Sequence, residues 1–319
     1  MNLGTRGSPL ALSQSEWVRS RLVEAHPGLQ IKLVVIRTTG DGQQGEAEGT
    51  FFGSGGQSLK GIFVKEIEDA LLDGSIDCAV HSLKDLPTEQ PADLVISAIP
   101  VREDPRDALA TRHGGRLEDL PEGACVGTSS PRRAAQLLAA RRDLRIEPVR
   151  GNIETRLRKM ENGALDAVVL AAAGLARLGL SDPDGRTRDG GARVCILPID
   201  VCTPAAGQGA LALETRTASQ TTRRLLEAIH DEASAAQVEA ERAFLEALGG
   251  GCRVPVAALA RPTTSGLEMR GVVLSADGAA RVVVEGTCAR GAGIEMGIGL
   301  AREALRAGAA SILEGAPRW

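Results

Sequence analysis

The chain has 319 residues, of which 43% are hydrophobic and 24% charged, so it is a globular protein too long for one compact core of ordinary size. The net charge of −4 excludes a general polyanion binder, and only 2% of the residues are aromatic, which leaves no stacking platform for nucleic acid. The six cysteines form no C-x-x-C pair, so we expect reduced thiols and no metal site. Because no leader pattern and no long apolar run occurs, we expect a cytoplasmic protein without a membrane segment.

The first part of the chain alternates between strand and helix patterns. Ser8 and Pro9 form a helix start, and Gln14 is a polar residue on the apolar stripe of that helix. The β-branched run at 31–36 is typical of a buried parallel strand, and the glycine-rich residues 38–60 predict a mobile loop. The other predicted elements are a strand at 3–5, a helix from 9 to about 26, a helix near 63–72, and strands at 77–80 and 94–98.

A second series of strands and helices begins after Arg106, and the pattern changes again near Glu239. Alternating elements imply parallel pairing with right-handed crossovers. The second series has strands at 107–110, 124–127, 144–149, 166–170 and 194–197, with helices starting at Pro131, Asn152 and Ala172. The last part predicts a helix that ends at three glycines, strands near 254–260, 267–274 and 280–288, and a final helix.

Asp85 lies just beyond the C-terminal end of one of the predicted parallel strands. Open α/β sheets bind ligands beyond the carboxyl ends of their strands, and a carboxylate there can hold a positive charge or relay a proton. A solvated Lys84-Asp85 turn before Pro87 is the simpler interpretation of the same residues.

Hydroxyl and arginine side chains gather where a strand meets the helix at Pro131. Arginine in a first helical turn is locally unfavourable, whereas backbone N–H groups, hydroxyls and guanidinium groups together suit a carboxylate or phosphate. Arg150, Arg156 and Arg177 occupy similar places in the next units, which indicates a cleft for a ligand with several negative charges. The residues of the first cluster are Thr128, Ser129, Ser130, Arg132 and Arg133.

Cys252 follows three glycines between a helix and a strand. A lone cysteine is most often a small buried hydrophobe, and the four histidines offer this one no obvious partner for a Cys-His nucleophile. Local sequence alone therefore favours an inert thiol.

Together these segments resemble the porphobilinogen deaminase family, whose members are also called hydroxymethylbilane synthases. The resemblance covers residues 5–255 in the family's order, and the remainder suits the family's third domain. The matching segments are residues 5–12, 60–66, 80–87, 102–107, 127–133, 150–156, 207–209 and 251–255.

The resemblance implies an α/β fold of two domains like those of periplasmic binding proteins, with a small α+β C-terminal domain. Domain 1 would comprise residues 1–99 and 200–218, domain 2 residues 100–199, and domain 3 residues 219–319. The implied enzyme is a monomeric transferase of tetrapyrrole (haem) biosynthesis, which deaminates porphobilinogen and joins four units head to tail before releasing hydroxymethylbilane.

The resemblance also implies the site residues. Cys252 would hold a dipyrromethane cofactor through a thioether, and Asp85 would be the catalytic carboxylate. Residues implied to bind the cofactor are Lys84, Thr128, Ser129, Ser130, Arg132, Arg133 and Arg150. Those implied to bind substrate are Arg6, Ser8, Gln14, Lys60, Phe63, Arg150, Arg156 and Arg177.

The sequence departs from the family at Thr39, where relatives often have arginine, and in the loop before Lys60. Two other interpretations remain open. A solute-binding protein on the same scaffold predicts a dispensable Cys252, and an enzyme that uses Cys252 as a transient nucleophile predicts a free thiol at rest.

Overall fold

The computed structural model describes residues 1–36, 59–181, 186–187, 191–249 and 255–315, with the backbone alone at 59–63. These residues form two compact units, which are described separately. Unit 1 consists of Met1–Arg102 and Ala210–Ala235, and unit 2 of Glu103–Gly209 and Ala236–Trp319. Thr39, Cys252 and most of the predicted loop at 38–60 lie outside the described residues.

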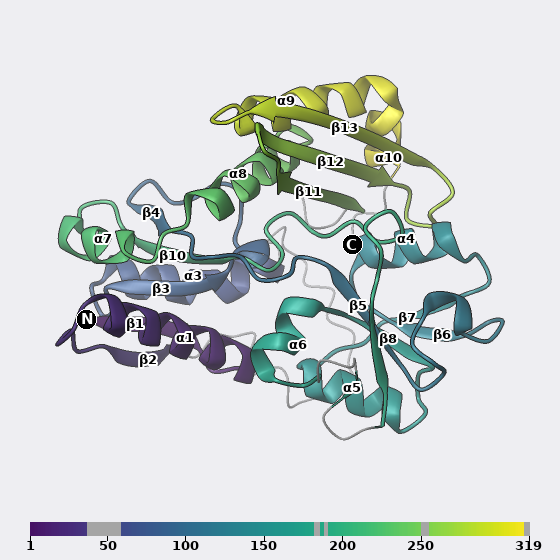
Figure 1. Ribbon diagram of the computed structural model, residues 1–319, viewed down its shortest axis with the longest axis horizontal. Helices are drawn as coiled ribbons and strands as arrows, with labels where there is room; N and C mark the ends of the chain where they lie inside the picture. Colours follow the sequence, from purple (N-terminus) through teal and green to yellow (C-terminus); the bar gives the residue numbers. More distant parts are fainter. Residues whose placement is uncertain (37–58, 182–185, 188–190, 250–254, 316–319) are drawn as a thin grey trace. The chain divides into compact units, whose positions relative to one another are not determined.

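Unit 1 is built around a five-stranded sheet in the order β2-β1-β3-β10-β4 (Figure 1). Strand β1 is parallel to β2 and β3, and β10 runs antiparallel between β3 and β4. The strands are β1 (Asn2–Arg6), β2 (Lys32–Ile36), β3 (Cys78–Ser82), β4 (Leu94–Ala98) and β10 (Leu211–Arg216). The helices are α1 (Pro9–Ala25), α3 (Leu59–Leu72) and α7 (Gln220–Glu227), and the 3-10 turn η1 (Leu83–Asp85) follows β3.

Two apolar clusters cover the faces of this sheet. Val18 and Leu22 of α1 pack with Leu226 of α7 and with residues of β1, β3 and β10. Ile67 and Leu71 of α3 belong to the other cluster, which includes residues of β3 and β4. Burial of a leucine of this kind contributes roughly 1.5–3 kcal/mol, so the sheet is held from both sides.

Helix α1 begins where the sequence predicts. The Ser8 side chain accepts a hydrogen bond of 3.3 Å from the backbone N–H of Ala11, and Pro9 supplies the fixed φ of the first helical position. Helix α3 begins at Leu59, so the last two residues of the predicted loop are helical.

The prediction of a buried strand at 31–36 is wrong. Among the described strands, β2 lies at the edge of the sheet with β1 as its one neighbour, and Val35 is 50% exposed. A β-branched run fits an edge strand as well as a central one, because the strand order that separates the two is not a local property.

Unit 2 contains a sheet with the same pattern, in the order β7-β6-β8-β5-β9. Strands β6, β7 and β8 are parallel, whereas β5 is antiparallel to both β8 and β9. The strands are β5 (Asp107–Thr111), β6 (Cys125–Gly127), β7 (Arg145–Glu147), β8 (Ala167–Ala171) and β9 (Arg193–Ile196). The helices are α4 (Pro131–Ala140), α5 (Ile153–Glu161) and α6 (Ala172–Leu178), with the 3-10 turn η2 (Leu117–Asp119).

The antiparallel strand of each sheet starts at the carboxyl ends of its parallel neighbours. Asp107, the first residue of β5, pairs with Ala171, the last residue of β8. Leu211, the first residue of β10, pairs in the same way with Ser82, the last residue of β3. The segments that lead into β5 and β10 therefore reach the edge at which open α/β sheets bind ligands.

The end of the chain forms a three-stranded antiparallel sheet, β11-β12-β13, with helices packed on one face (Figure 1). Phe244 of α8 is fully buried there, and Gly271 of β12 makes room for it, since a Cβ at Gly271 would lie 2.4 Å from the Phe244 ring. The strands are β11 (Val256–Pro262), β12 (Gly266–Leu274) and β13 (Arg281–Ala289). The helical segments are α8 (Glu232–Ala247), α9 (Gly293–Ala304), the π-helical turn η3 (Leu305–Ala309) and α10 (Ala310–Glu314). The predicted fold class, two α/β sheets with a small α+β part, is confirmed.

Candidate functional site

A cavity in unit 1 brings together four of the residues that the sequence analysis singled out. Arg6 ends β1, Ser8 caps α1, Gln14 lies in the second turn of that helix, and Asp85 closes η1. All four line one cavity of about 90 Å³, together with His81 and Ser82 of β3. The cavity lies at the carboxyl ends of β1 and β3, as expected for a ligand site in an open α/β sheet.

Gln14 is held in place from inside the protein. It is 4% exposed, and its side-chain amide exchanges two hydrogen bonds with the Ser82 hydroxyl, at 3.0 and 3.1 Å. A buried amide with a satisfied partner is rigid, so the polar residue on the apolar stripe of α1 links that helix to the end of β3.

Beside this cavity lies a buried acid-base pair that the sequence analysis did not single out. His81 of β3 is 7% exposed, and its Nε2 lies 2.9 Å from Oε2 of the fully buried Glu214 of β10. Burial and the neighbouring Glu214 raise the pKa of Glu68 on α3 above its usual range. Two acidic side chains, Glu214 and Glu68, therefore lie close to the wall of the cavity that contains His81.

Four other residues that the family resemblance implies are not found among the residues that line this cavity. Lys84 is half-buried within η1 but does not line the cavity. Lys60 and Phe63 lie in the first two turns of α3, at positions where only the backbone is described. Cys252 lies outside the described residues.

In unit 2, the hydroxyl residues at the start of α4 hold the local backbone. Ser130 is the N-cap, and its oxygen lies 3.5 Å from the backbone N of Arg133. The Ser129 hydroxyl donates to the Val149 carbonyl at 2.9 Å and accepts from the Val149 N–H at 3.0 Å. The Thr128 oxygen accepts from the Ser130 N–H at 3.2 Å. These bonds fix the turn between β6 and α4 and thereby place the two arginines that follow.

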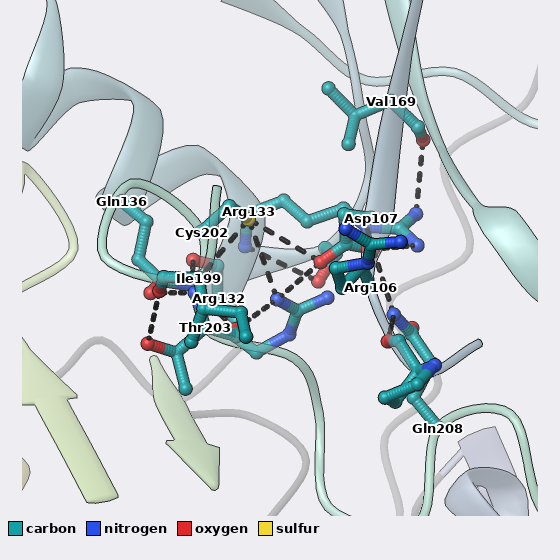
Figure 2. A network of polar contacts seen from close by, with 12 residues as sticks. Arg106, Asp107, Arg132, Arg133, Gln136, Val169, Ile199, Cys202, Thr203 and Gln208 are labelled. Atoms are coloured by element: carbon teal, nitrogen blue, oxygen red, sulfur yellow. Dashed lines mark hydrogen bonds and ion pairs between the residues drawn. The ribbon is translucent and has the colours of Figure 1, made fainter. Parts of the chain in front are cut away.

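Figure 2 shows where those arginines point: both contact the carboxylate of Asp107. Arg132 Nη1 donates to Oδ2 at 2.7 Å, and Arg133 donates to Oδ1 from Nε at 2.9 Å and from Nη2 at 2.7 Å. The exposed fractions of Asp107, Arg132 and Arg133 are 0%, 5% and 6%. Gln208 adds a bond of 3.0 Å to Oδ1.

This buried cluster has one carboxylate for two guanidinium groups. Burial alone would raise the pKa of Asp107, but Arg132 and Arg133 outweigh it and hold that pKa below its usual range. Asp107 is therefore ionised at neutral pH, and the three side chains carry a surplus of one positive charge. A buried surplus charge is costly unless a further anion approaches it.

Two more of the predicted arginines are partly buried in unit 2. Arg156 Nε donates to the Gly151 carbonyl at 2.9 Å, and burial, with the nearby Arg133, lowers its pKa. Arg177 Nη2 donates to the Gly209 carbonyl at 2.7 Å, and burial lowers its pKa as well. Arginine stays charged at neutral pH even so, and both side chains add positive potential. Arg150 is exposed.

A larger cavity, of about 560 Å³, lies against the C-terminal sheet. Its charged lining residues are Asp200 and two ion pairs, Arg261 with Glu268 at 2.9 Å and Arg270 with Glu285. Because both arginines are already paired with glutamates, we assign no ligand to this cavity.

The sequence analysis missed His81, Asp107 and Gln208 as site residues. All three lie inside segments that carried the family resemblance, at 80–87, 102–107 and 207–209. Their role depends on the partners Glu214, Arg132 and Arg133, which are distant in sequence or lie on another element. The only sequence signal for these three residues was therefore their position inside segments that resemble the family.

Fold and site together define an α/β protein that has a cavity and a buried cationic cluster, each at the carboxyl edge of a sheet. These features suit a small ligand with several carboxylates. Two family models match the chain, "porphobilinogen deaminase, dipyromethane cofactor binding domain" at residues 1–224 and "porphobilinogen deaminase, C-terminal domain" at residues 235–306. The chain belongs to the porphobilinogen deaminase family.

Curated relatives support the same assignment. A porphobilinogen deaminase of Syntrophotalea carbinolica is 50% identical over 87% of this chain and 84% of its own length. One of Pelotomaculum thermopropionicum is 47% identical over 98% of this chain and 95% of its own length. The solved BvgS periplasmic VFT2 domain of Bordetella pertussis aligns at 15% identity over 72% of this chain and 86% of that chain, with a TM-score of 0.40.

The predicted function is confirmed at the level of the family. Porphobilinogen deaminases are hydroxymethylbilane synthases, so the chain is a transferase of tetrapyrrole biosynthesis that acts on porphobilinogen and uses a dipyrromethane cofactor. Among the described helices, none has both the length and the apolar character needed to cross a membrane.

Proposed function

We propose that this chain makes hydroxymethylbilane for haem biosynthesis in the cytoplasm, as a monomer, on a dipyrromethane joined to Cys252 by a thioether. The cavity of unit 1 is the observation that carries the proposal, because it groups Asp85 with Arg6, Ser8 and Gln14. In this proposal domain 1 comprises residues 1–99 and 200–218, domain 2 residues 100–199, and domain 3, with the cysteine, residues 219–319.

Asp85 is the catalytic carboxylate in this proposal. When ammonia leaves porphobilinogen, positive charge develops on the methylene-pyrrole, and a fixed carboxylate nearby stabilises that charge. The same carboxylate accepts hydrogen bonds from pyrrole N–H groups, which orients the ring. The half-buried position of Asp85, at a cavity with room for only a few waters, strengthens both interactions relative to open solvent.

Basic residues hold the acetate and propionate groups of the pyrroles. Arg6 and Ser8 face the same cavity as Asp85 and suit one carboxylate of the incoming substrate. Lys60 and Phe63, at the start of α3, are assigned to substrate as well, as are Arg150, Arg156 and Arg177.

The residues at the carboxyl edge of unit 2 fit the cofactor. The buried arginine pair has a surplus positive charge, which a cofactor carboxylate would offset. Bound there, the dipyrromethane supplies the free pyrrole carbon to which new units are added. The residues assigned to hold it are Lys84, Thr128, Ser129, Ser130, Arg132, Arg133 and Arg150, with Cys252 as the covalent anchor.

Intact-protein mass spectrometry tests the covalent assignment. We expect freshly purified, active chain to carry one added dipyrromethane, which digestion locates on the Cys252 peptide. Cys252→Ser should lack both the added mass and turnover. Cys288→Ser removes a half-buried thiol of the C-terminal sheet and should keep both, which makes it the matched control.

Two results would contradict the assignment. Active chain with an unmodified Cys252 would support a transient nucleophile instead. Full turnover by Cys252→Ser would show that the thiol is dispensable.

A further inference from the structure

The position of Asp107 follows from the direction of strand β5. Because β5 runs antiparallel to β8, its first residue lies at the edge where the parallel strands end. Helix α4 starts at the same edge, and its first turn carries Arg132 and Arg133. A fully buried carboxylate thus meets two arginines at the ligand-binding edge of the sheet.

Asp107 contacts the two guanidinium groups in different ways (Figure 2). Arg133 uses its Nε–Nη2 edge on Oδ1, and its Nη1 donates to the Val169 carbonyl at 3.0 Å, so all three nitrogens are engaged. Arg132 uses Nη1 alone, at 2.7 Å from Asp107 Oδ2 and 2.6 Å from the Thr203 carbonyl.

The other edge of Arg132 is therefore available. Within the part of the chain that the structure describes, Nε and Nη2 of Arg132 make no hydrogen bond. These two nitrogens form the fork that binds a carboxylate with two parallel bonds. Neither nitrogen is among the fully buried polar atoms without a partner, so the small exposed part of this side chain, 5%, leaves both within reach of a ligand.

We propose that Asp107 is a positioning residue, which holds Arg132 by Nη1 so that the Nε–Nη2 edge receives a carboxylate of a bound pyrrole unit. The proposal rests on the proposed function, which supplies a ligand with such carboxylates. Arg133 attracts the same carboxylate through its charge and not through a fork, because Asp107 already occupies its Nε–Nη2 edge. Gln208 supports the arrangement by donating to Oδ1 at 3.0 Å and to the Pro105 carbonyl at 2.7 Å.

Two explanations of the role of Asp107, one through its charge and one through its positioning of Arg132, make opposite predictions for Asp107→Asn. Removing a negative charge beside an anion site should, on charge alone, strengthen binding of a carboxylate. If Asp107 instead fixes the direction of the Arg132 fork, the same change weakens binding, because the guanidinium loses its charged anchor. The sign of the effect therefore separates the two explanations.

The experiment measures loading and turnover in the same chains. The family resemblance implies that the dipyrromethane is assembled from two porphobilinogen units. Purified apoprotein is therefore incubated with limiting porphobilinogen, the loaded fraction is followed by intact mass, and KM and kcat are then measured on loaded protein. We expect Asp107→Asn to slow loading or raise KM by about 10- to 100-fold, the scale of a misplaced binding group. Slower loading assigns the carboxylate to the cofactor, and a raised KM assigns it to the incoming substrate.

Asp166→Asn is the matched control. Asp166 accepts a bond of 2.7 Å from the Cys125 N–H, at the opposite edge of the same sheet, so its loss tests for a general effect on the domain. Arg132→Lys keeps the positive charge but has no fork, and it carries the test if Asp107→Asn does not fold. The double variant Asp107→Asn with Arg132→Lys should lose no more than the more severe single variant.

Three outcomes overturn the inference: Asp107→Asn that loads and turns over at least as well as wild type, Asp166→Asn that loses as much, or Arg132→Lys that loses nothing. A wild-type chain that takes up no porphobilinogen contradicts the proposed function itself, which separates the two failures.

Discussion

At the scale of the residue, Asp85 is placed by its apolar neighbours. Leu83 begins the short turn η1 and Leu86 follows it, with exposed fractions of 0% and 5%, and the Leu86 N–H donates to the Leu83 carbonyl at 3.1 Å. These anchors hold the backbone on both sides of Asp85, while its side chain faces the cavity. The position of the carboxylate thus depends on buried leucines, and replacing the carboxylate should leave the turn intact.

We therefore expect Asp85→Asn to lower kcat by about 100-fold or more, because a neutral amide cannot stabilise developing positive charge. The midpoint of thermal unfolding should change by no more than that of Asp93→Asn, an exposed carboxylate of the same unit. Ammonia release and circular dichroism measure the two effects. Undiminished turnover by Asp85→Asn would remove Asp85 from the catalytic role.

Sequence reasoning found the residues that stand at the ends of recognisable strands. Asp85 and Arg132 each lie a few residues beyond the end of such a strand, and patterns of burial are local. Asp107 was not identified as a site residue, because the alternation of strands and helices predicted parallel pairing throughout. In a parallel β5 its first residue would lie at the opposite edge, far from Arg132. The direction of β5 depends on pairing with distant segments, which a local pattern does not contain.

At the scale of the element, the turn between β12 and β13 rests on helix α4. Gly278, at the tip of this turn, has a φ of +70°, and a Cβ there would lie 2.3 Å from the Ala135 carbonyl oxygen and 2.7 Å from the Ala139 N. Ala135 and Ala139 pack with Ala257, Val272 and Leu274 of the C-terminal sheet. The helix that carries Arg132 is thereby fixed to the C-terminal sheet by close backbone contact.

Gly278→Ala should therefore destabilise the chain by about 2–4 kcal/mol, from the left-handed backbone and from the clash with α4. Gly291→Ala is the control, since Gly291 has a φ of +84° but a Cβ added there would have no described atom within 4 Å. It should cost only about 1–2 kcal/mol. Denaturant unfolding measures both, and equal losses would show that the contact with α4 contributes nothing.

Most element boundaries followed from local signals. Ser8-Pro9 and Ser130-Pro131 both cap helices as predicted, because a cap depends on neighbouring residues alone. Strand β2 was placed correctly along the chain but wrongly in the sheet, since an edge position depends on strand order.

At the scale of the whole molecule, each compact unit is assembled from separate stretches of chain. Strand β10 belongs to the sheet of unit 1 although it follows all of the sheet of unit 2 in sequence. Within that sheet β10 is the only neighbour of β4 among the described strands. Unit 1 therefore cannot complete its sheet until residues 210–216 are present.

A fragment of residues 1–209 tests this dependence. We expect the amides of β4 to exchange rapidly in the fragment, because their hydrogen-bonding partner is missing. The amides of β8 should keep their protection, since the sheet of unit 2 is complete within the fragment. Hydrogen exchange followed by mass spectrometry compares the two strands in one sample. Equal protection of β4 and β8 would contradict the expectation.

The antiparallel strands β5 and β10 also limit where the chain tolerates an insertion or a deletion. Connecting segments usually accept insertions, because little depends on their exact span. Here Arg106 leads directly into Asp107, and Ala210 directly into Leu211, without a spacer before the ligand-binding edge. One added residue that slipped β5 by a single position would turn every side chain of the strand to the opposite face. Asp107 would then leave Arg132 even though no residue of the site had been replaced.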